Sequence, residues 1–366
     1  MVLESVHALR RGGCAVTVTV PETGPLVPLL EATGAKVVVL AVPVLRKAYL
    51  TPRGLLRLSA EVALRLPAML RLLRRTRPDL VYVNTIILPF WLLAARLTGR
   101  PAACHVHEAE EGLGRAVAAC VDAPLLLARR VLVNSEAAKA GLCAVLPVLR
   151  PRVRLIYNGV AGPPEPPKPP REQLTGQIRL VLVGRLSPRK GTDVAVTAVR
   201  LLRDRGHDIR LDLVGAVFPG YEWFAADLRR QVHDEGLDEH VHFLGFTTDV
   251  WPCLDVADVV LVPSRAEPFG NVAVEAALAE RPIVASKVQG LKEIVSDGTT
   301  GLLTEAGSAP ALAAAVSGLL DDWDRARRLA AAAQEQALRR FGRQQYAATL
   351  LSLLAEAGRP SRHRRT

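Results

Sequence analysis

Glu267 and Glu275, separated by seven residues, are the first pair of side chains that could act together in chemistry. Glu267 belongs to a loop sequence, and the run NVAVEAAL that follows it has apolar residues at helical spacing. We expect a helix there, with Asn271 as its N-cap and Glu275 in its first turn. Gly270 lets the backbone approach a ligand closely, and the N–H groups that open a helix bind anions. The stretch therefore predicts two carboxylates beside an anion-binding helix end.

A basic loop supplies the opposite charge. The sequence GRLSPRKG, residues 184–191, follows the mainly apolar stretch 178–183, which predicts a strand. Arg185 can bind two phosphate oxygens at once and Lys190 adds a compact positive charge, so the pair suits a diphosphate. The alternative is a pair of solvated loop charges. The loop lacks Walker A spacing and no G-x-G-x-x-G follows a predicted strand, which argues against a P-loop NTPase or an NAD-dependent enzyme.

Predicted helices and strands alternate through both halves of the chain, which indicates α/β domains with parallel sheets of Rossmann type. Ligands of such sheets bind beyond the carboxyl ends of the strands, where both loops begin. The expected strands are 15–20, 36–40, 79–83, 102–106, 131–133, 152–156, 178–183, 209–214, 241–246, 259–262 and 283–285. The expected helices include 1–11, 26–33, 55–75, 86–97, 192–205, 272–278 and 309–357, the last with a break at Gly342.

The stretch PSRAEPFGNVAVEAALAERPIVASKVQGLKEIVSDGTTGLL, residues 263–303, resembles retaining glycosyltransferases of family 4. These enzymes have the GT-B fold, in which two Rossmann-like domains face a cleft. Two glutamates at this spacing are a weak signal alone. The surrounding P-S-x-x-E-x-F-G and G-x-x-E-I-V-x-D-G-x-x-G-L-L patterns make the signal specific. The resemblance is close over the second half of the chain and loose over the first.

The resemblance also implies roles for single residues. Arg185 and Lys190 would hold the donor diphosphate, and Glu275 would accept hydrogen bonds from the donor ribose. Glu267 would contact the transferred sugar, with a solvated loop acid as the alternative interpretation. The further positions that it places at the donor are Gly184, Phe246, Phe269, Gly270 and Asn271.

Two histidines close the predicted strand at 102–106. Alternation along a strand places His105 and His107 on the same face, but no third ligand is spaced to complete a metal site. The family has a histidine at this strand end that faces the transferred sugar; the resemblance implies that role for His107, with His105 as the alternative. A core histidine with satisfied hydrogen bonds is the other interpretation.

The D-x-D sequence at 322–324 has the form of a metal motif, but we interpret it as the solvated face of a helix.

The proline-rich sequence AGPPEPPKPPREQLTG, residues 161–176, predicts a semi-rigid linker between domains. The expected divisions are an acceptor-side domain at 1–162, a linker at 163–176, a donor-binding domain at 177–343, a helix returning to the first domain at 344–357 and a disordered basic tail at 358–366.

The family opens with a strand and a glycine-rich loop, whereas this sequence begins with a predicted helix. Our hypothesis is that Met1 is an internal methionine of a longer protein and that the first domain lacks its first strand.

Composition limits the class of protein. The chain of 366 residues has 49% hydrophobic residues and room for two cores, and its longest apolar tract, 80–95, is too interrupted to predict a transmembrane helix. Five cysteines without C-x-x-C spacing argue against disulfides and zinc and favour a reducing cytoplasm. The formal charge of +11 predicts an anionic partner. Nucleic acid is disfavoured, because aromatic residues make up only 4% of the chain and the basic residues form no single stripe.

The predicted helix at 55–75 combines helically spaced apolar residues with five arginines. Such a helix can lie on an anionic membrane. The alternative is a helix packed on the core with an exposed basic face. Pro67 is expected to weaken a single continuous helix.

The expected reaction moves a sugar from a nucleoside diphosphate sugar to a hydroxyl of a glycan, a lipid or a cell-envelope polysaccharide, with retention at the anomeric carbon. We expect this hexosyl transfer to need no metal ion and no cofactor, since Arg185 and Lys190 take the place of the metal. Two other classes stay open: a non-hydrolysing sugar-nucleotide epimerase and a catalytically silent nucleotide-sugar-binding module. We expect the protein in the cytoplasm, with the inner face of the plasma membrane as the alternative location.

Overall fold

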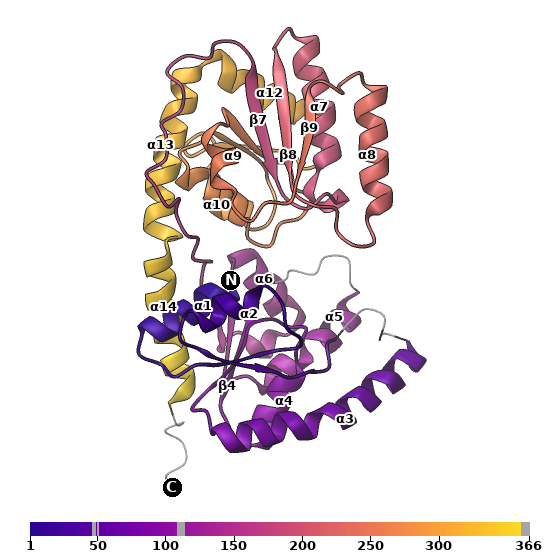
Figure 1. Ribbon diagram of the computed structural model, residues 1–366, viewed down its shortest axis with the longest axis vertical. Coiled ribbons are helices and arrows are strands. Elements are labelled where there is room, and N and C mark those ends of the chain that lie inside the picture. Colours follow the sequence, from indigo (N-terminus) through magenta and orange to yellow (C-terminus); the bar gives the residue numbers. More distant parts are fainter. Residues whose placement is uncertain (46–48, 50, 108–113, 360–366) are drawn as a thin grey trace. The chain divides into compact units, whose positions relative to one another are not determined.

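The structure is a computed structural model that describes residues 1–45, 49, 51–107 and 114–359. The chain divides into two compact units, one made of Met1–Gly159 and Arg343–Thr366 and the other of Val160–Gly342. Every paired strand in the described residues runs parallel to its neighbours. The prediction of two α/β units with parallel sheets is confirmed (Figure 1).

The second unit contains a six-stranded sheet in the order β12-β11-β10-β7-β8-β9. Its strands are β7 (Ile178–Val183), β8 (Ile209–Val214), β9 (Val241–Gly245), β10 (Val259–Val262), β11 (Ile283–Ser286) and β12 (Leu302–Thr304). The predicted bounds of β7, β8 and β10 match: β10 is a continuous apolar run, and β7 and β8 are mainly apolar with one and two charged residues. The edge strand β12 was not predicted, since three residues are too few to show a pattern.

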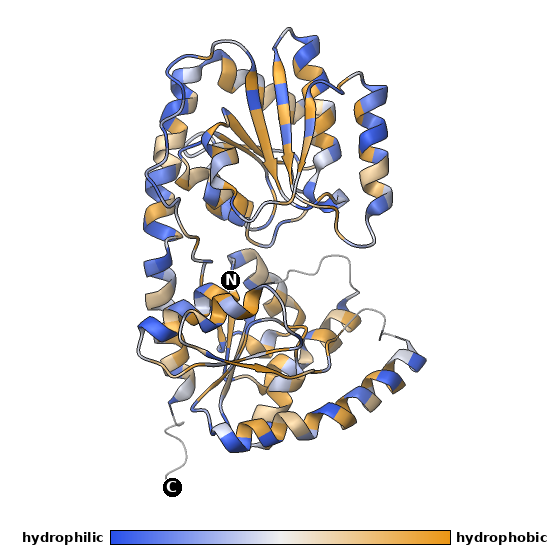
Figure 2. Cartoon of the chain, viewed as in Figure 1, coloured by the Kyte–Doolittle hydropathy of each residue, from blue (hydrophilic) through white to orange (hydrophobic). Residues whose placement is uncertain are grey.

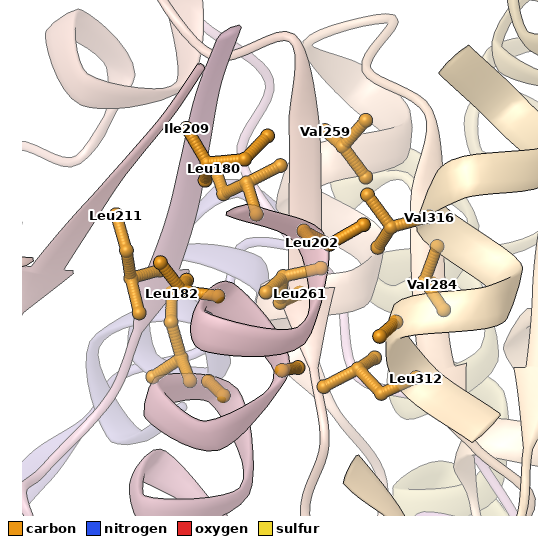
Figure 3. Packing of buried hydrophobic residues seen from close by; sticks show 14 of the residues in the cluster. Leu180, Leu182, Leu202, Ile209, Leu211, Val259, Leu261, Val284, Leu312 and Val316 are labelled. Carbon is orange, nitrogen blue, oxygen red and sulfur yellow. The ribbon is translucent and has the colours of Figure 1, made fainter. Parts of the chain in front are cut away.

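Helices cover both faces of this sheet, because successive residues of each strand point to opposite sides. The helices are α7 (Thr192–Asp204), α8 (Glu222–Asp234), α9 (Trp251–Asp255), α10 (Asn271–Leu278), α11 (Leu291–Ile294), α12 (Ala309–Asp321) and α13 (Trp323–Arg340). Figure 3 shows one face, where Leu180 and Leu182 of β7 pack with Leu202 of α7 and with Leu312 and Val316 of α12. The packing of these buried side chains holds β7 and its neighbours in place, and with them the loops that follow the strands.

The strand order reverses at β7. The chain proceeds from β7 to β8 on one side, and later places β10 on the other side. Such a reversal is the usual ligand-binding position in an open parallel sheet, because the connections leave in opposite directions and open a crevice at the carboxyl ends.

The first unit contains two separate parallel sheets, β1-β2 and β3-β4-β5-β6. Their strands are β1 (Thr17–Val20), β2 (Lys36–Val39), β3 (Val81–Val83), β4 (Ala102–Val106), β5 (Arg130–Val133) and β6 (Val153–Leu155). All six lie within or next to the predicted ranges. In the described residues no strand pairing joins the two sheets.

The helices of the first unit include one that comes from the other end of the chain. They are α1 (Val2–Arg11), α2 (Leu26–Glu31), α3 (Pro52–Thr76), α4 (Phe90–Leu97), α5 (Arg115–Asp122), α6 (Glu136–Val145) and α14 (Arg343–Gly358). Leu350 and Leu354 of α14 pack with Leu132 of β5 and Ala103 of β4. On the other face, Met69 of α3 is buried with the residues of α4.

Two helical predictions differ from the structure. α3 continues through Pro67 as one helix, because Met69 and Leu73 beyond the proline stay anchored in the core. The segment 309–357 has a second break at Asp322, whose Oδ1 accepts a hydrogen bond from Arg325 N over 2.9 Å and caps α13. Asp322 is thus a helix cap. Both aspartates of the D-x-D sequence are exposed, as the interpretation of a solvated face requires, whereas Trp323 between them is buried, so for this residue the interpretation was wrong.

The proline-rich segment is fastened to the second unit. Arg171 binds both carboxylate oxygens of the buried Asp258, at 2.7 and 2.5 Å. Trp323 Nε1 donates to the Arg171 backbone oxygen over 2.7 Å. The predicted tail at 358–366 lies outside the described residues from position 360 onward. Within the part of the chain that the structure describes, no helix is both long enough and apolar enough to span a membrane.

Candidate functional site

Two loops of the second unit meet at the carboxyl ends of neighbouring strands. β7 and β10 pair in parallel, so the loops at 184–191 and 263–270 leave the sheet side by side. Gly191 packs directly on Pro263: a Cβ at Gly191 would lie 2.0 Å from the Pro263 carbonyl oxygen, and the φ of Gly191 is +67°. Only glycine permits this approach and this backbone conformation without strain. The contact brings the side chains of both loops together.

Lys190 and Glu267 form the centre of this junction. Lys190 Nζ donates to Glu267 Oε2 over 2.5 Å. Ser264 Oγ donates to the same oxygen over 3.3 Å, and Arg189 Nη1 lies 3.6 Å from it. The backbone oxygen of Glu267 accepts from Gly290 N over 3.1 Å. Because Glu267 is only 8% exposed, its charge is offset by these neighbours more than by water.

Glu275 is electrostatically coupled to the same lysine. It is the fifth residue of α10, so it lies in the second helical turn and not in the first as predicted. The reason is the helix start: α10 begins at Asn271, and Gly270, with φ +116°, occupies the N-cap position that was predicted for Asn271. Burial raises the pKa of the Glu275 carboxyl, while the charge of Lys190 acts to lower it. Lys190 therefore acts on both glutamates of the predicted pair.

Arg185 lies on the same loop but points to a different partner. Its guanidinium carbon is 4.7 Å from the ring centroid of Phe218, which gives a cation–π contact. The side chain is exposed. Gly184, next to it, lies beside the lysine stem, since a Cβ there would come within 3.4 Å of Lys190 Cδ. The structure brings Lys190, Glu267 and Glu275 together, whereas Arg185 has no hydrogen bond or ion pair with either acid in the described part of the chain.

The two phenylalanines predicted at the donor occupy opposite environments. Phe246 follows β9 and is 73% exposed, so its ring is accessible to a ligand. Phe269 is buried, and its ring packs edge-to-face on Phe341 at a centroid distance of 5.7 Å. Phe269 can therefore offer only its backbone to a ligand. Gly290 supports it closely, because a Cβ at Gly290 would lie 2.6 Å from Phe269 Cα.

The predicted histidine belongs to the first unit. His107 directly follows β4, and its Nε2 lies 2.8 Å from Asn84 Oδ1. His105 shares its face as predicted, with ring centroids 3.9 Å apart. Burial lowers the pKa of His107 to about 4 and lowers the pKa of His105 well below its ordinary value. Both rings are therefore neutral at pH 7, and the described residues contain no group of three or more His, Cys, Asp or Glu side chains placed to hold a metal ion.

Sequence reasoning missed three residues that contact the predicted ones. Arg189 and Ser264 were inside the recognised motifs but received no role, although both approach Glu267. Asn84 was noted only as an interruption of an apolar tract. A signal for it did exist: Asn84 follows β3, the parallel neighbour of β4, and carboxyl ends of neighbouring parallel strands meet at one edge.

Comparison with known proteins gives two family matches. The model of "Glycosyl transferases group 1" matches residues 167–336, and that of "Glycosyltransferase Family 4" matches residues 1–161. Each match falls within one of the two structural units, apart from a few residues at the junction.

Curated relatives align with part of the chain. A D-inositol 3-phosphate glycosyltransferase of Corynebacterium glutamicum is 36% identical over 49% of this chain and 43% of its own length. A glycogen synthase of Mycobacterium tuberculosis is 32% identical over 57% of this chain and 50% of its own length. A GDP-mannose-dependent phosphatidylinositol monomannoside mannosyltransferase of the same species is 36% identical, over 45% and 44%. The chain thus aligns with half the length of these relatives or less.

Solved structures match over nearly the whole chain. Anabaena HepE in complex with UDP and glucose superposes with a TM-score of 0.80 and 23% identity, covering 96% of this chain and 95% of the other. Sucrose-phosphate synthase of Thermosynechococcus elongatus superposes with a TM-score of 0.74 and 24% identity, covering 97% and 91%. At these identities the likeness concerns the fold. With one family model on each unit and this shared fold, the chain belongs to glycosyltransferase family 4 and has the GT-B fold.

Proposed function

We propose that the protein is a retaining glycosyltransferase that moves a hexose from a nucleoside diphosphate sugar to an acceptor hydroxyl. The observation that carries this proposal is the position of Lys190 between Glu267 and Glu275, at the reversal of strand order between β7 and β10. One cation flanked by two acids suits a donor that has an anionic diphosphate and a neutral, hydroxyl-rich sugar and ribose. Lys190 would bind the diphosphate, and the carboxylates would accept hydrogen bonds from hydroxyls.

The departing diphosphate is the group that needs stabilisation in this reaction. Lys190, Arg185 and the backbone N–H groups that open α10 supply positive charge and donors, which act more strongly as charge develops in the transition state. A phosphate oxygen then takes the proton of the acceptor hydroxyl on the face that the leaving group vacates, which gives retention. These protein cations make a metal ion unnecessary in the proposed mechanism.

The transferred sugar would be held by Glu267 and, by family resemblance, by His107. A neutral imidazole can hydrogen-bond to a sugar hydroxyl without placing a full positive charge beside the developing oxocarbenium ion. The low pKa of His107 supports this role, because the ring stays neutral throughout the neutral pH range.

Two arms of one NMR assay test the reaction. UDP-, GDP- and ADP-sugars are first screened by the rise in melting temperature, since a ligand of the native state stabilises it. The best donor is then followed by NMR with and without candidate acceptor polyols and glycans. A new glycosidic bond with the donor's anomeric configuration, formed in the presence of EDTA, is the expected result.

The same assay separates the alternatives. A changed sugar configuration without acceptor would identify an epimerase. Binding without any turnover, for every donor and acceptor, would identify a silent nucleotide-sugar-binding module. An inverted product would contradict the retaining mechanism, and loss of turnover in EDTA would contradict metal independence.

The acceptor side of the proposal includes contact with an anionic membrane through α3. This helix carries six arginines and one glutamate. Leu56 and Leu64, 73% and 78% exposed, lie among them on the solvent side, and Figure 2 shows hydrophilic and hydrophobic residues interleaved along α3. Exposed leucines flanked by arginines match the acyl boundary and the charged headgroups of an anionic bilayer.

Sedimentation with lipid vesicles tests this contact. The protein is expected to bind vesicles that contain phosphatidylglycerol more strongly than vesicles of phosphatidylcholine alone. Leu64→Asp should reduce binding, whereas Leu338→Asp, the same change at a 62% exposed leucine of α13, should not. Equal binding by the two variants would contradict a specific role of α3.

A further inference from the structure

Asn84 is hydrogen-bonded on both ends of its side-chain amide. Its Oδ1 lies 2.8 Å from His107 Nε2. Its Nδ2 donates to Tyr82 Oη over 3.0 Å and to Ser5 Oγ over 3.1 Å. These partners come from α1, β3 and the end of β4, so three segments of the first unit meet at one amide group.

Hydrogen bonds between further side chains continue from Ser5 and Tyr82 into the core of the first unit. Tyr346 Oη of α14 lies 2.7 Å from Ser5 Oγ, and Tyr82 Oη lies 2.7 Å from His105 Nδ1. Burial raises the pKa of Tyr82 and of Tyr346, so both phenols are neutral at every pH at which the protein would be assayed. Neutral hydroxyls can both donate and accept, which lets each of them serve two neighbours at once.

The protons in this network have a consistent assignment. The two N–H groups of the Asn84 amide face Tyr82 and Ser5, which leaves the amide oxygen toward His107. That oxygen can only accept, so His107 must carry its proton on Nε2 and the lone pair on Nδ1. Tyr82 accepts from Asn84 and donates to His105 Nδ1, which places the His105 proton on Nε2. Every hydroxyl and amide proton in this network then has an acceptor, whereas the His105 Nε2–H is buried without a hydrogen-bond partner among the described residues.

We propose that Asn84 is a positioning residue for His107: it fixes the ring and holds it in the Nε2–H tautomer. The inference rests on the role proposed for His107 in holding the sugar. In this tautomer the lone pair of the ring is on Nδ1, which is buried in the structure. Nδ1 is the atom that would accept a hydrogen bond from a sugar hydroxyl when donor binding exposes it. Ser5 and Tyr82 orient the Asn84 amide by accepting its N–H groups, and Tyr346 in turn orients Ser5.

The neighbouring strand provides a matched control. Asn134 follows β5, the other parallel neighbour of β4, and is almost fully buried. Its Nδ2 donates to the backbone oxygen of His107 over 3.4 Å, and within the described residues it has no hydrogen bond to the ring. Two asparagines thus flank the same histidine, and of these two only Asn84 is hydrogen-bonded to the imidazole.

The first experiment measures the tautomer in the protein without substrate. Nitrogen NMR of histidine-labelled protein at pH 7 is expected to show protonated Nε2 and unprotonated Nδ1 for His107. Asn84→Ala should give a mixture of tautomers. Asn84→Asp keeps the acceptor and adds a charge, so it should retain the Nε2–H form and raise the pKa of His107. Asn134→Ala should leave the tautomer unchanged.

The second experiment measures turnover. If the donor is turned over, Asn84→Ala should lower kcat on the order of a hundredfold through misplacement of the ring, with donor KM little changed. Tyr346→Phe should also lower kcat, but by less, because the hydroxyl of Tyr346 on α14 contacts Ser5 and reaches Asn84 only through it. Asn134→Ala removes the neighbouring asparagine, which has no hydrogen bond to the ring, and should lower kcat much less.

The tautomer of His107 tests the positioning role of Asn84, and turnover tests the proposed transferase function, so the two can fail separately. A wild-type His107 protonated on Nδ1, or an Asn84→Ala protein with an unchanged tautomer, would overturn the positioning role whatever the activity. The expected tautomers in a protein without transferase activity would leave the positioning intact and refute the proposed function. An active Asn84→Ala protein with unchanged kcat would show that the tautomer does not matter to transfer.

Discussion

Lys190 is shared by two carboxylates whose environments differ. Glu267 lies within hydrogen-bonding distance and is nearly inaccessible to water, whereas the pKa of Glu275 is raised by burial despite the lysine. In the absence of donor, the lysine charge is engaged by Glu267. A bound diphosphate would compete for that charge, so donor binding and the Lys190–Glu267 contact are coupled.

Lys190→Met separates stability from catalysis at this position. The change leaves a buried carboxylate without its closest cation, which should destabilise the second unit by about 3 kcal/mol. Adding Glu267→Gln removes the unpaired charge, so the double variant should regain most of that stability in urea unfolding. Turnover should not recover, because the diphosphate still lacks its cation, and the expected loss is on the order of a hundredfold or more. A double variant that regains turnover would contradict the role of Lys190.

The buried histidines predict a pH dependence of stability. Burial lowers the pKa of His107 to about 4, and in the unfolded chain the pKa is about 6.5. As the pH falls below about 6.5 the unfolded chain takes up a proton that the folded protein does not. The stabilisation is therefore complete above about pH 6.5 and is lost as the pH falls towards 4, by up to about 3 kcal/mol for this ring. His105, whose pKa is also lowered, acts in the same direction.

Urea unfolding of wild type and His107→Gln across pH 4.5 to 7 measures this effect. The wild-type midpoint should fall more steeply with decreasing pH than that of the variant, which has no proton to take up at position 107. Parallel curves for the two proteins would contradict the low pKa of His107.

At the scale of elements, the loop after β7 depends on a glycine for its contact with the strand next to it. Gly191 combines a left-handed φ with a Cβ position that the Pro263 carbonyl oxygen already occupies. The loop can reach Glu267 only because the two backbones touch there. A larger residue would push apart the loops that carry Lys190 and Glu267.

Gly191→Ala should destabilise the second unit by more than the strain of a left-handed alanine, which is on the order of 1 to 2 kcal/mol. Gly206→Ala isolates that strain, since Gly206 has φ +91° and a Cβ there would meet nothing within 4 Å. The melting temperature of Gly191→Ala should therefore lie below that of Gly206→Ala, and its donor affinity should fall as well. Equal melting temperatures would show that the contact with Pro263 relaxes without cost.

At the scale of the whole molecule, the two units differ in how the chain builds them. The second is one continuous segment, 160–342, whereas the first needs α14 from the other end of the chain. Tyr346, Leu350 and Leu354 of α14 are buried in the first unit, next to Ala103 and Leu132. Without α14 the apolar face of β4 and β5 would meet water.

Fragments test this difference. Residues 160–342 should fold alone, with a cooperative thermal transition by circular dichroism, because their core is complete. Residues 1–159 should lack such a transition, and a peptide of residues 343–359 should restore it. A cooperative transition of residues 1–159 alone, at the temperature of the intact first unit, would contradict the role of α14.

The sequence by itself determined the parallel α/β class, most strand positions and the residue types of the basic loop and the glutamate pair. Those features are local: a mainly apolar stretch defines β7, a continuous apolar run defines β10, and the charges of Lys190 and Glu267 are visible in the sequence. The helix boundaries were less well determined, since Gly270 and Asp322 act as caps only in the folded backbone.

Only the tertiary structure decided which of these residues meet. Strand order places β10 beside β7, and that pairing brings Lys190 to Glu267 across 77 positions of sequence. The same kind of pairing, β3 beside β4, brings Asn84 to His107, and the direction of Arg185 toward Phe218 depends on its neighbours in space. Periodicity records which face of a strand is buried, but it carries no information about which strand lies next to it, because that choice depends on packing of the whole unit.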